Sequence, residues 1–246
     1  MKILLILALL VGVVAVVGGQ QQQRNQQQRT TPSTTSSSKK GQDEEPRFLA
    51  LPDAVKCSRR PKEFFYDGHW YFYSGNVTKY RNAEVDWLEA RNACREYCMD
   101  TVSIETEEEN NIIFDLVRDN RLKYIWSSGR LCDFKGCGDR EDLQPISVNG
   151  WFWSGSGTKM APTNVKPKNW TYQPWSFTGN NKRPQPDNAE LDINGTPESC
   201  LAVLNNVYKD GLHWHDVACY HPKAFVCEDS EELLRYARAT NPNLPI

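Results

Sequence analysis

The sequence lacks an excess of charge of either sign, and it lacks any long hydrophobic run after its first nineteen residues. Its 29 Lys and Arg residues face 31 Asp and Glu residues, which gives a formal net charge of −2. Binding to nucleic acid or to an anionic membrane surface draws on an excess of basic charge. The composition therefore argues against a nucleic-acid partner and against insertion of the domain into a membrane.

The sequence also lacks the local motifs of common enzymes. No nucleophile elbow, no H-E-x-x-H helix and no phosphate-binding glycine loop occurs in it. Its acidic residues are spaced as metal ligands rather than as an acid and base pair. We therefore expect a protein that is not an enzyme.

The N-terminal 46 residues divide into two segments of contrasting composition. Residues 1–19 carry Lys2, an apolar run and small residues, which is typical of a cleaved secretory signal peptide. Residues 20–46 are rich in Gln, Ser and Thr and lack the apolar residues that a core requires, so they are expected to be a disordered leader. The leader is either an O-glycosylated spacer or an unmodified tether.

Residues 47–228 show the mixed pattern of one folded domain, and residues 229–246 are expected to form a C-terminal tail outside it. Asp67-Gly68 between aromatic runs predicts a hairpin over 64–73. Helical spacing predicts helices over 84–94 and 106–119, the second beginning with a capping box. Short aromatic or β-branched strands follow, separated by long loops between 127 and 198. The predicted class is α+β.

Eight cysteines are an even number, and in an oxidising compartment such a set forms disulfides. Three N-x-S/T triplets, at Asn76, Asn169 and Asn194, are candidate N-glycosylation sites and fit the same route. The expected localisation is secreted and extracellular.

An oxygen-rich group lies near the end of the domain, where Gln185, Asp187, Glu198 and Asp216 surround a proline and two cysteines. Acidic side chains are seldom buried without a partner, so this group is either a solvated loop or a cage for a cation. Pro186 is expected to be cis, because a tight turn there would direct both neighbours to one point. A second possibility is a transition-metal site formed by His213, His215 and Asp216.

The order of these features resembles a C-type lectin-like domain. The resemblance covers about Cys57 to Glu228 and is carried by "DWLEARNAC", "SIETEEEN", "IWSSG", "GWFWS", "QPD", "ESC", "WHDVAC" and "FVCE". The polar leader and the "LCDFKGC" insert are similar to those of secreted single-domain lectins of arthropods. The resemblance implies a fold of two helices with antiparallel sheets and a long loop region, stapled by disulfides.

The resemblance also implies a disulfide pairing. The pairs that match the family are Cys94 with Cys227 and Cys200 with Cys219. Among the remaining four, Cys132 and Cys137 are close enough in sequence to close a local loop, which leaves Cys57 with Cys98.

By the same resemblance, Gln185, Asp187, Glu198 and Asp216 would bind Ca²⁺, and the ion would bind a sugar. Trp170 and Trp175 are the candidates for stacking on that sugar. In the family the Q-P-D triplet accompanies galactose-type sugars. His215 stands where the family has Asn, within both the metal site and the sugar site, and imidazole suits Ca²⁺ poorly, so weak binding is expected.

Two functions follow. The first is a secreted lectin that binds extracellular glycans or glycoproteins through Ca²⁺. The alternative is a structural or adhesive protein of extracellular matrix or cuticle, which contacts protein or matrix polysaccharide without calcium. The cluster of oxygen ligands favours the lectin, and His215 with the long leader favours the alternative.

Overall fold

The computed structural model describes residues 47–246. The signal peptide expected over 1–19 and the leader expected over 20–46 lie outside these residues. The helices are α1 (Ala54–Ser58), α2 (Trp87–Arg95), α3 (Glu107–Asp119), α4 (Ile146–Asn149), α5 (Ala189–Asn194) and α6 (Glu231–Thr240), with 3-10 turns at Ser74–Asn76, Thr78–Tyr80 and Glu141–Leu143. The strands are β1 (Phe64–Tyr66), β2 (His69–Tyr73), β3 (Met99–Thr101), β4 (Tyr124–Leu131), β5 (Trp151–Trp153), β6 (Cys200–Asn205), β7 (Leu212–Val217) and β8 (Ala224–Asp229).

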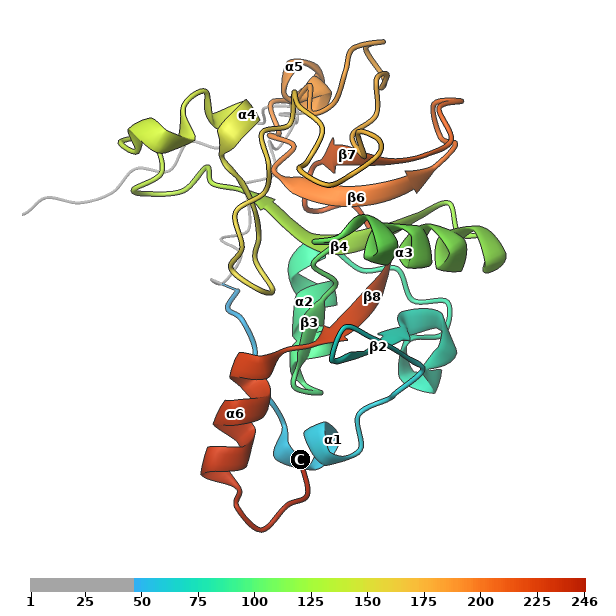
Figure 1. Cartoon of the computed structure of the whole chain (residues 1–246), viewed down its shortest axis with the longest axis vertical. Coiled ribbons are helices and arrows are strands. Elements are labelled where there is room, and N and C mark those ends of the chain that lie inside the picture. Colours follow the sequence, from blue (N-terminus) through green and yellow to red (C-terminus); the bar gives the residue numbers. More distant parts are fainter. Residues whose placement is uncertain (1–46) are drawn as a thin grey trace, which may run out of the picture. The chain divides into compact units, whose positions relative to one another are not determined.

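The strands form a mixed sheet in the order β1-β2-β8-β4-β6-β7, with β3 added to β8 and β5 added to β4. The pairs are antiparallel except for β4 with β8, which is parallel. Helices α2 and α3 flank the central strands, and α5 and the long loops gather beside β6 and β7 (Figure 1). The class is therefore α+β, as expected.

Both central helices begin with a side-chain cap, and the cap at Thr106 is the one that the sequence predicts. The Asp86 carboxylate accepts a hydrogen bond from the Glu89 amide at 2.9 Å at the start of α2. The Thr106 hydroxyl oxygen accepts one from the Glu109 amide at 3.1 Å at the start of α3. The second half of the expected capping box differs, because the Glu109 carboxylate accepts from the Glu105 amide instead of from the cap residue. Glu109 is thereby directed into the interior, where it is 4% exposed.

Two apolar clusters lie on opposite sides of the sheet. One packs α3 and the tryptophans of β5 and β7 against β6, and the other packs α2 against β4, β6 and β8. Cys94–Cys227 joins α2 to β8, and Cys200–Cys219 joins β6 to the segment after β7. Cys132–Cys137 closes a short loop, so with Cys57–Cys98 the structure pairs all eight cysteines in the expected way.

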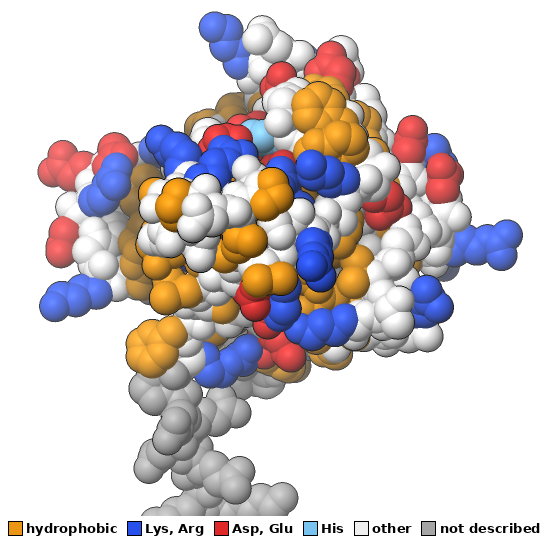
Figure 2. Space-filling view, turned by 90° about the horizontal axis from the view of Figure 1, so that it is seen from below, with side chains coloured by type: hydrophobic (Ala, Val, Ile, Leu, Met, Phe, Trp, Pro, Cys, Tyr) orange, Lys and Arg blue, Asp and Glu red, His pale blue; other side chains and the backbone are white. Residues whose placement is uncertain are grey.

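The C-terminal segment packs on the N-terminal part of the domain. Leu233, Leu234 and Ala237 of α6 cover the Cys57–Cys98 disulfide, together with the last residue, Ile246. The Ser230 hydroxyl caps this helix. This end of the molecule lies opposite β6, β7 and α5 (Figure 1). On the face seen from below, acidic and basic side chains alternate with apolar ones, so neither sign of charge dominates it (Figure 2).

Candidate metal centre and adjoining pocket

Three carboxylates meet at the loop end of the sheet. Asp216 lies in β7, and the antiparallel pairing of Cys200 with Val217 places the end of β7 beside the start of β6. Glu198 lies two residues before β6, and Asp187 lies in the loop before α5. One carboxylate oxygen from each of the three residues lies within 4.8 Å of the others. Three of the residues expected to bind a cation are thus brought together.

The loop is held in place by hydrogen bonds around Asp216. Its carboxylate accepts from the backbone amides of Asp187 at 3.2 Å and Asn188 at 2.7 Å. The side-chain oxygen of Asn188 in turn accepts from the Glu198 amide at 2.8 Å. Asn188 has a φ of +51°, a left-handed conformation that asparagine tolerates better than most residues. The Gln185–Pro186 bond is cis, as expected.

Asn188 is a site residue that the sequence reasoning missed. It links two of the three acidic residues, since its backbone amide donates to the Asp216 carboxylate and its side-chain oxygen accepts from the Glu198 amide. The signal that could have found it is its position directly after the Q-P-D triplet. An asparagine following such a turn is a frequent left-handed residue and a frequent side-chain cap.

The carboxylates lack partners for part of their oxygens. Asp187 Oδ2 and Glu198 Oε2 are buried and accept no hydrogen bond. Burial, with Asp187 close by, raises the pKa of Glu198 to about 7. Burial and the nearby charge of Glu198 raise the pKa of Asp216 to about 8. Unneutralised, half-buried oxygens at this spacing fit a hard cation such as Ca²⁺, which would satisfy them and remove their mutual repulsion.

His215 is not directed at the carboxylates, which corrects its expected role as a ligand. Its ring is 1% exposed, and both of its nitrogens have other partners. Nε2 lies 2.9 Å from Asp210 Oδ2, and Nδ1 lies 3.2 Å from Gln185 Oε1. Asp210 also accepts from the Ser176 hydroxyl at 2.6 Å. His215 therefore serves as a buried support that holds Gln185 beside the site.

Asp210 and Ser176 had no sequence signal that linked them to His215. Asp210 lies in the turn between β6 and β7, five residues before the histidine, and Ser176 lies in the loop before the Q-P-D triplet. The charge of Asp210 tends to raise the pKa of His215, but burial has the larger effect and lowers it.

The tryptophans proposed for sugar stacking are buried, which corrects that expectation too. Trp170 is 6% exposed and Trp175 is 3% exposed. The Trp175 ring lies edge-on to Trp151, with centroids 5.1 Å apart, and to Trp214 at 5.9 Å. Loop packing places these rings in the core, because a large aromatic surface is more stable when it is removed from water. Neither ring has a free face for a sugar.

The transition-metal alternative finds no support in the geometry. The His213 ring nitrogen Nδ1 lies 3.2 Å from the Pro174 carbonyl oxygen, and His215 is engaged with Asp210. Among residues 47–246, the only group of three or more potential ligands that converges is Asp187, Glu198 and Asp216. An all-oxygen set of this kind favours calcium over zinc or copper.

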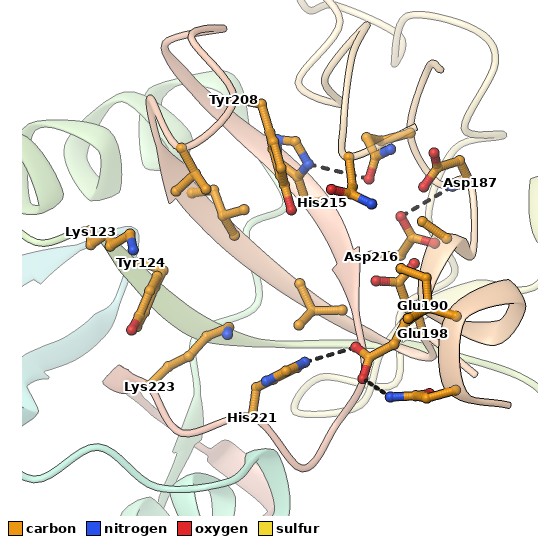
Figure 3. Close-up of a pocket in the computed structure, with 18 residues that line it drawn as sticks. Lys123, Tyr124, Asp187, Glu190, Glu198, Tyr208, His215, Asp216, His221 and Lys223 are labelled. Atoms are coloured by element: carbon orange, nitrogen blue, oxygen red, sulfur yellow. Dashed lines mark hydrogen bonds and ion pairs between the residues drawn. The ribbon is translucent and has the colours of Figure 1, made fainter. Parts of the chain in front are cut away.

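A cavity of about 340 Å³ adjoins the three carboxylates (Figure 3). Gln185, Asp187, Glu198, His215 and Asp216 all line it. A second cavity of about 330 Å³ adjoins the same carboxylates and is lined by apolar residues that include Leu131 and Trp151. The carboxylates therefore border two hollows, of which the first also contains basic side chains. Such a volume is typical of a site for a small ligand.

Comparison with known proteins gives this geometry a context. No family model matches the chain. A curated relative, the CD209 antigen of Symphalangus syndactylus, is 25% identical over 185 residues, which make up 72% of this chain. The described domain is C-type lectin-like. The chain spans 38% of the length of that relative.

Solved structures are similar to the lectin-like domain at a lower level of identity. The carbohydrate-recognition domain of the mouse scavenger receptor C-type lectin is 18% identical, with a TM-score of 0.44, over 69% of this chain and 95% of that one. The C-type lectin CEL-I from Cucumaria echinata is 18% identical, with a TM-score of 0.43, over 68% and 93%. The herring type II antifreeze protein is 19% identical, with a TM-score of 0.40, over 68% and 94%.

Two further observations concern the disulfides of the domain and whether one of its helices could span a membrane. Four disulfides are present, which is typical of proteins that fold in an oxidising compartment. No helix within residues 47–246 is both long and apolar enough to span a membrane.

Proposed function

We propose that this protein is a secreted lectin that binds extracellular glycans or glycoproteins through a calcium ion held by Asp187, Glu198 and Asp216. The observation that carries the proposal is the pair of buried, unpartnered oxygens, Asp187 Oδ2 and Glu198 Oε2. Leaving such atoms without a partner costs free energy, and a divalent cation would remove that cost. The C-type lectin-like fold supports the same function.

The role of each residue follows from its contacts. Asp187, Glu198 and Asp216 would supply carboxylate oxygens, and the two backbone amides donated to Asp216 would keep its carboxylate fixed. Gln185, held by His215, lies next to them and lines the same cavity. Bound calcium would offer coordination positions to two hydroxyl groups of a sugar. The Q-P-D triplet favours a galactose-type sugar.

Calcium binding is expected to be weak. Ca²⁺ takes six to eight oxygen ligands, whereas three carboxylates converge here. His215 adds no oxygen, and the oxygen of Gln185 is already in contact with the His215 ring. Water and the sugar itself would have to complete the coordination, so glycan and calcium should each strengthen the binding of the other.

Calorimetric titration with calcium tests the metal site. The wild type should bind one ion, and Asp187→Asn should bind it at least about tenfold more weakly, because a charged ligand is lost without a change in shape. Asp192→Asn is the matched control, since Asp192 is an exposed acidic residue of α5. Equal calcium affinity in all three proteins would contradict the assignment.

A glycan panel probed with calcium and then with a chelator tests the lectin function. Binding that the chelator abolishes supports it. If the protein binds matrix polysaccharide equally well with the chelator present, the adhesive function is favoured instead. The buried contact between His215 and Asp210 is compatible with that function, because the contact needs no metal.

A further inference from the structure

Lys223 is a buried lysine whose backbone joins the start of β8 to the segment before α2. It precedes β8 and exchanges both backbone hydrogen bonds with Val85, at 2.9 and 3.0 Å. The residue is only 6% exposed. Lysine is rarely buried to this degree unless its charge has a partner.

The ammonium group of Lys223 lacks an anionic partner. It lies over the rings of Tyr124 and Trp126, 4.5 and 4.6 Å from their centroids. None of the hydrogen bonds or ion pairs found within residues 47–246 involves its Nζ. Lys56 and Lys79, by contrast, are both paired with Glu96. Burial lowers the pKa of Lys223 to about 8, which reflects the missing partner.

The charges of Glu84 and Glu190 both favour the ammonium form of Lys223, but neither carboxylate forms an ion pair with its Nζ. Glu190 lines the same cavity, but its Oε2 lies 2.8 Å from His221 Nε2. Its Oε1 accepts from the Asn194 amide at 2.8 Å and from the Tyr220 hydroxyl. These contacts engage both oxygens of the Glu190 carboxylate, and no ion pair within residues 47–246 joins Glu190 to the Lys223 ammonium.

The cavity therefore has a cluster of three carboxylates at one end and lysines at the other, and the Glu190 carboxylate that contacts His221 also lines it. Asp187, Glu198 and Asp216 lie at one end, while Lys223 extends into it from the other, beside Tyr124 and His221 (Figure 3). Lys123 lies at the same end, with its ammonium 5.6 Å from the centroid of the Tyr124 ring. A ligand that spans the cavity would contact the three carboxylates with its hydroxyl groups at one end and the Lys223 ammonium at the other.

We propose that the glycan bound in this cavity carries an anionic group, a sulfate or a carboxylate, which pairs with Lys223. This inference rests on the proposed calcium-dependent glycan binding and adds the class of glycan. The carboxylates repel an anion at their own end, so the charge pattern also orients the sugar. Its hydroxyls face Asp187, Glu198 and Asp216, and its anionic group faces the Lys223 ammonium.

Binding of matched neutral and anionic sugars to the full chain tests the inference. The probes are galactose, mannose, their 6-sulfates and galacturonic acid, each titrated with calcium present. Wild type should bind at least one 6-sulfate or the uronic acid about tenfold more tightly than the parent sugar, since a hydrogen bond to a buried charge is worth about that factor. Whether sulfate or carboxylate shows the gain distinguishes the two sources of negative charge.

Substitutions assign the gain to one side chain. Lys223→Met, which retains length and apolar contact, should bring the anionic and neutral sugars to within about threefold of each other, and Lys223→Arg should retain a preference. Lys62→Met is the matched control, because Lys62 also lies over a ring, 5.6 Å from the centroid of Trp70, but does not line the cavity. Unchanged calcium affinity in each variant shows that the fold is intact.

The outcomes separate this inference from the proposed function. Calcium-dependent binding with no anionic preference, or a preference that survives in Lys223→Met, overturns the inference and leaves the lectin function standing. Anionic sugars that bind equally well in chelator, and lose affinity in Lys223→Met, support the Lys223 site and overturn calcium dependence. Failure of every sugar to bind overturns both.

Discussion

The domain contains two clusters of buried carboxylates that look alike in composition and differ in their hydrogen bonds. Asp187, Glu198 and Asp216 lie among the loops, and two of their oxygens accept no hydrogen bond. Glu109 lies in α3 and Glu228 in β8, and each of their four oxygens has a partner. Those partners are the Tyr71 hydroxyl, the Glu105 and Ser103 amides and the His69 ring.

This difference is the reason for placing the proposed cation at Asp187, Glu198 and Asp216. Burial raises the pKa of acidic groups in both, to about 8 for Glu109 and for Asp216. A raised pKa therefore does not distinguish a structural pair from a binding site. Glu109 and Glu228 can hold a proton between them, and all of their oxygens are already hydrogen-bonded. In the other cluster, Asp187 Oδ2 and Glu198 Oε2 have no hydrogen-bond donor. Hydrogen-bond satisfaction is the more informative observation.

The largest effect should come from breaking the satisfied cluster. Glu109→Ala removes the acceptor for the Glu105 amide and one acceptor of the Tyr71 hydroxyl, and it leaves a cavity under α3. We expect the free energy of unfolding to fall by about 2–4 kcal/mol. Urea unfolding measures this, with Glu108→Ala on the exposed face of the same helix as the control. A loss no larger than the control's would show that the network contributes little.

The next effect is on calcium affinity. Glu198→Gln should weaken calcium binding by about 100-fold, or about 2.7 kcal/mol, because it replaces a charged ligand of the trio by a neutral one. Glu109→Gln, the same chemical change in the other cluster, should alter calcium affinity less than about twofold. If both substitutions weaken binding equally by calorimetry, the distinction between the clusters is wrong.

A smaller effect is the pH dependence of the satisfied pair. The folded pKa of Glu109 is about 8 against an ordinary value of 4.5, so its stabilising contribution is complete below about pH 4.5 and is lost as pH rises through 8. Hydrogen bonding to Glu228 raises the pKa of His69, so the contribution of His69 to stability also decreases as the pH rises. Stability should fall by about 1–2 kcal/mol between pH 5 and pH 8.

The matched variant for this pH dependence is Glu109→Gln. Its amide oxygen can accept from the Glu105 amide, and its NH₂ can donate to the Tyr71 oxygen, so the shape is kept while the titrating charge is removed. The fall in stability between pH 5 and pH 8 should shrink in this variant, as followed by urea unfolding at each pH. An equally steep fall would show that other groups control it.

Local patterns in the sequence predicted the elements well, because their determinants are short-range. The hairpin at Asp67-Gly68, the Thr106 cap and the cis Pro186 depend on neighbours a few residues away. The three carboxylates could also be predicted, since the Q-P-D triplet and the ends of β6 and β7 recur in fixed order in the domain that the sequence resembles.

The contacts that depend on loop packing could not be predicted. Trp175 looked accessible in a polar loop, but the loop folds back and buries the ring against Trp151 and Trp214. His215 was expected to face the cation, whereas Asp210, in the preceding turn, engages its ring from the other side. Lys223 carried no signal, since only the fold brings it into the cavity with the carboxylates. Pairing across loops is not encoded in any local spacing.

The smallest expected effect concerns His215. His215→Asn should free the Gln185 oxygen from the imidazole and add an amide oxygen nearby, so calcium affinity should rise about three- to tenfold, which is at most about 1.4 kcal/mol. The same change deprives Asp210 of a hydrogen-bond partner, so the free energy of unfolding without calcium should fall by about 1 kcal/mol. Asp210→Asn is the matched control, because it weakens the hold on His215 without supplying an oxygen ligand. For His215→Asn alone, calcium affinity by calorimetry should therefore rise while the free energy of unfolding by urea falls. A calcium affinity equal to that of the wild type would show that neither His215 nor Gln185 limits calcium binding at the carboxylates.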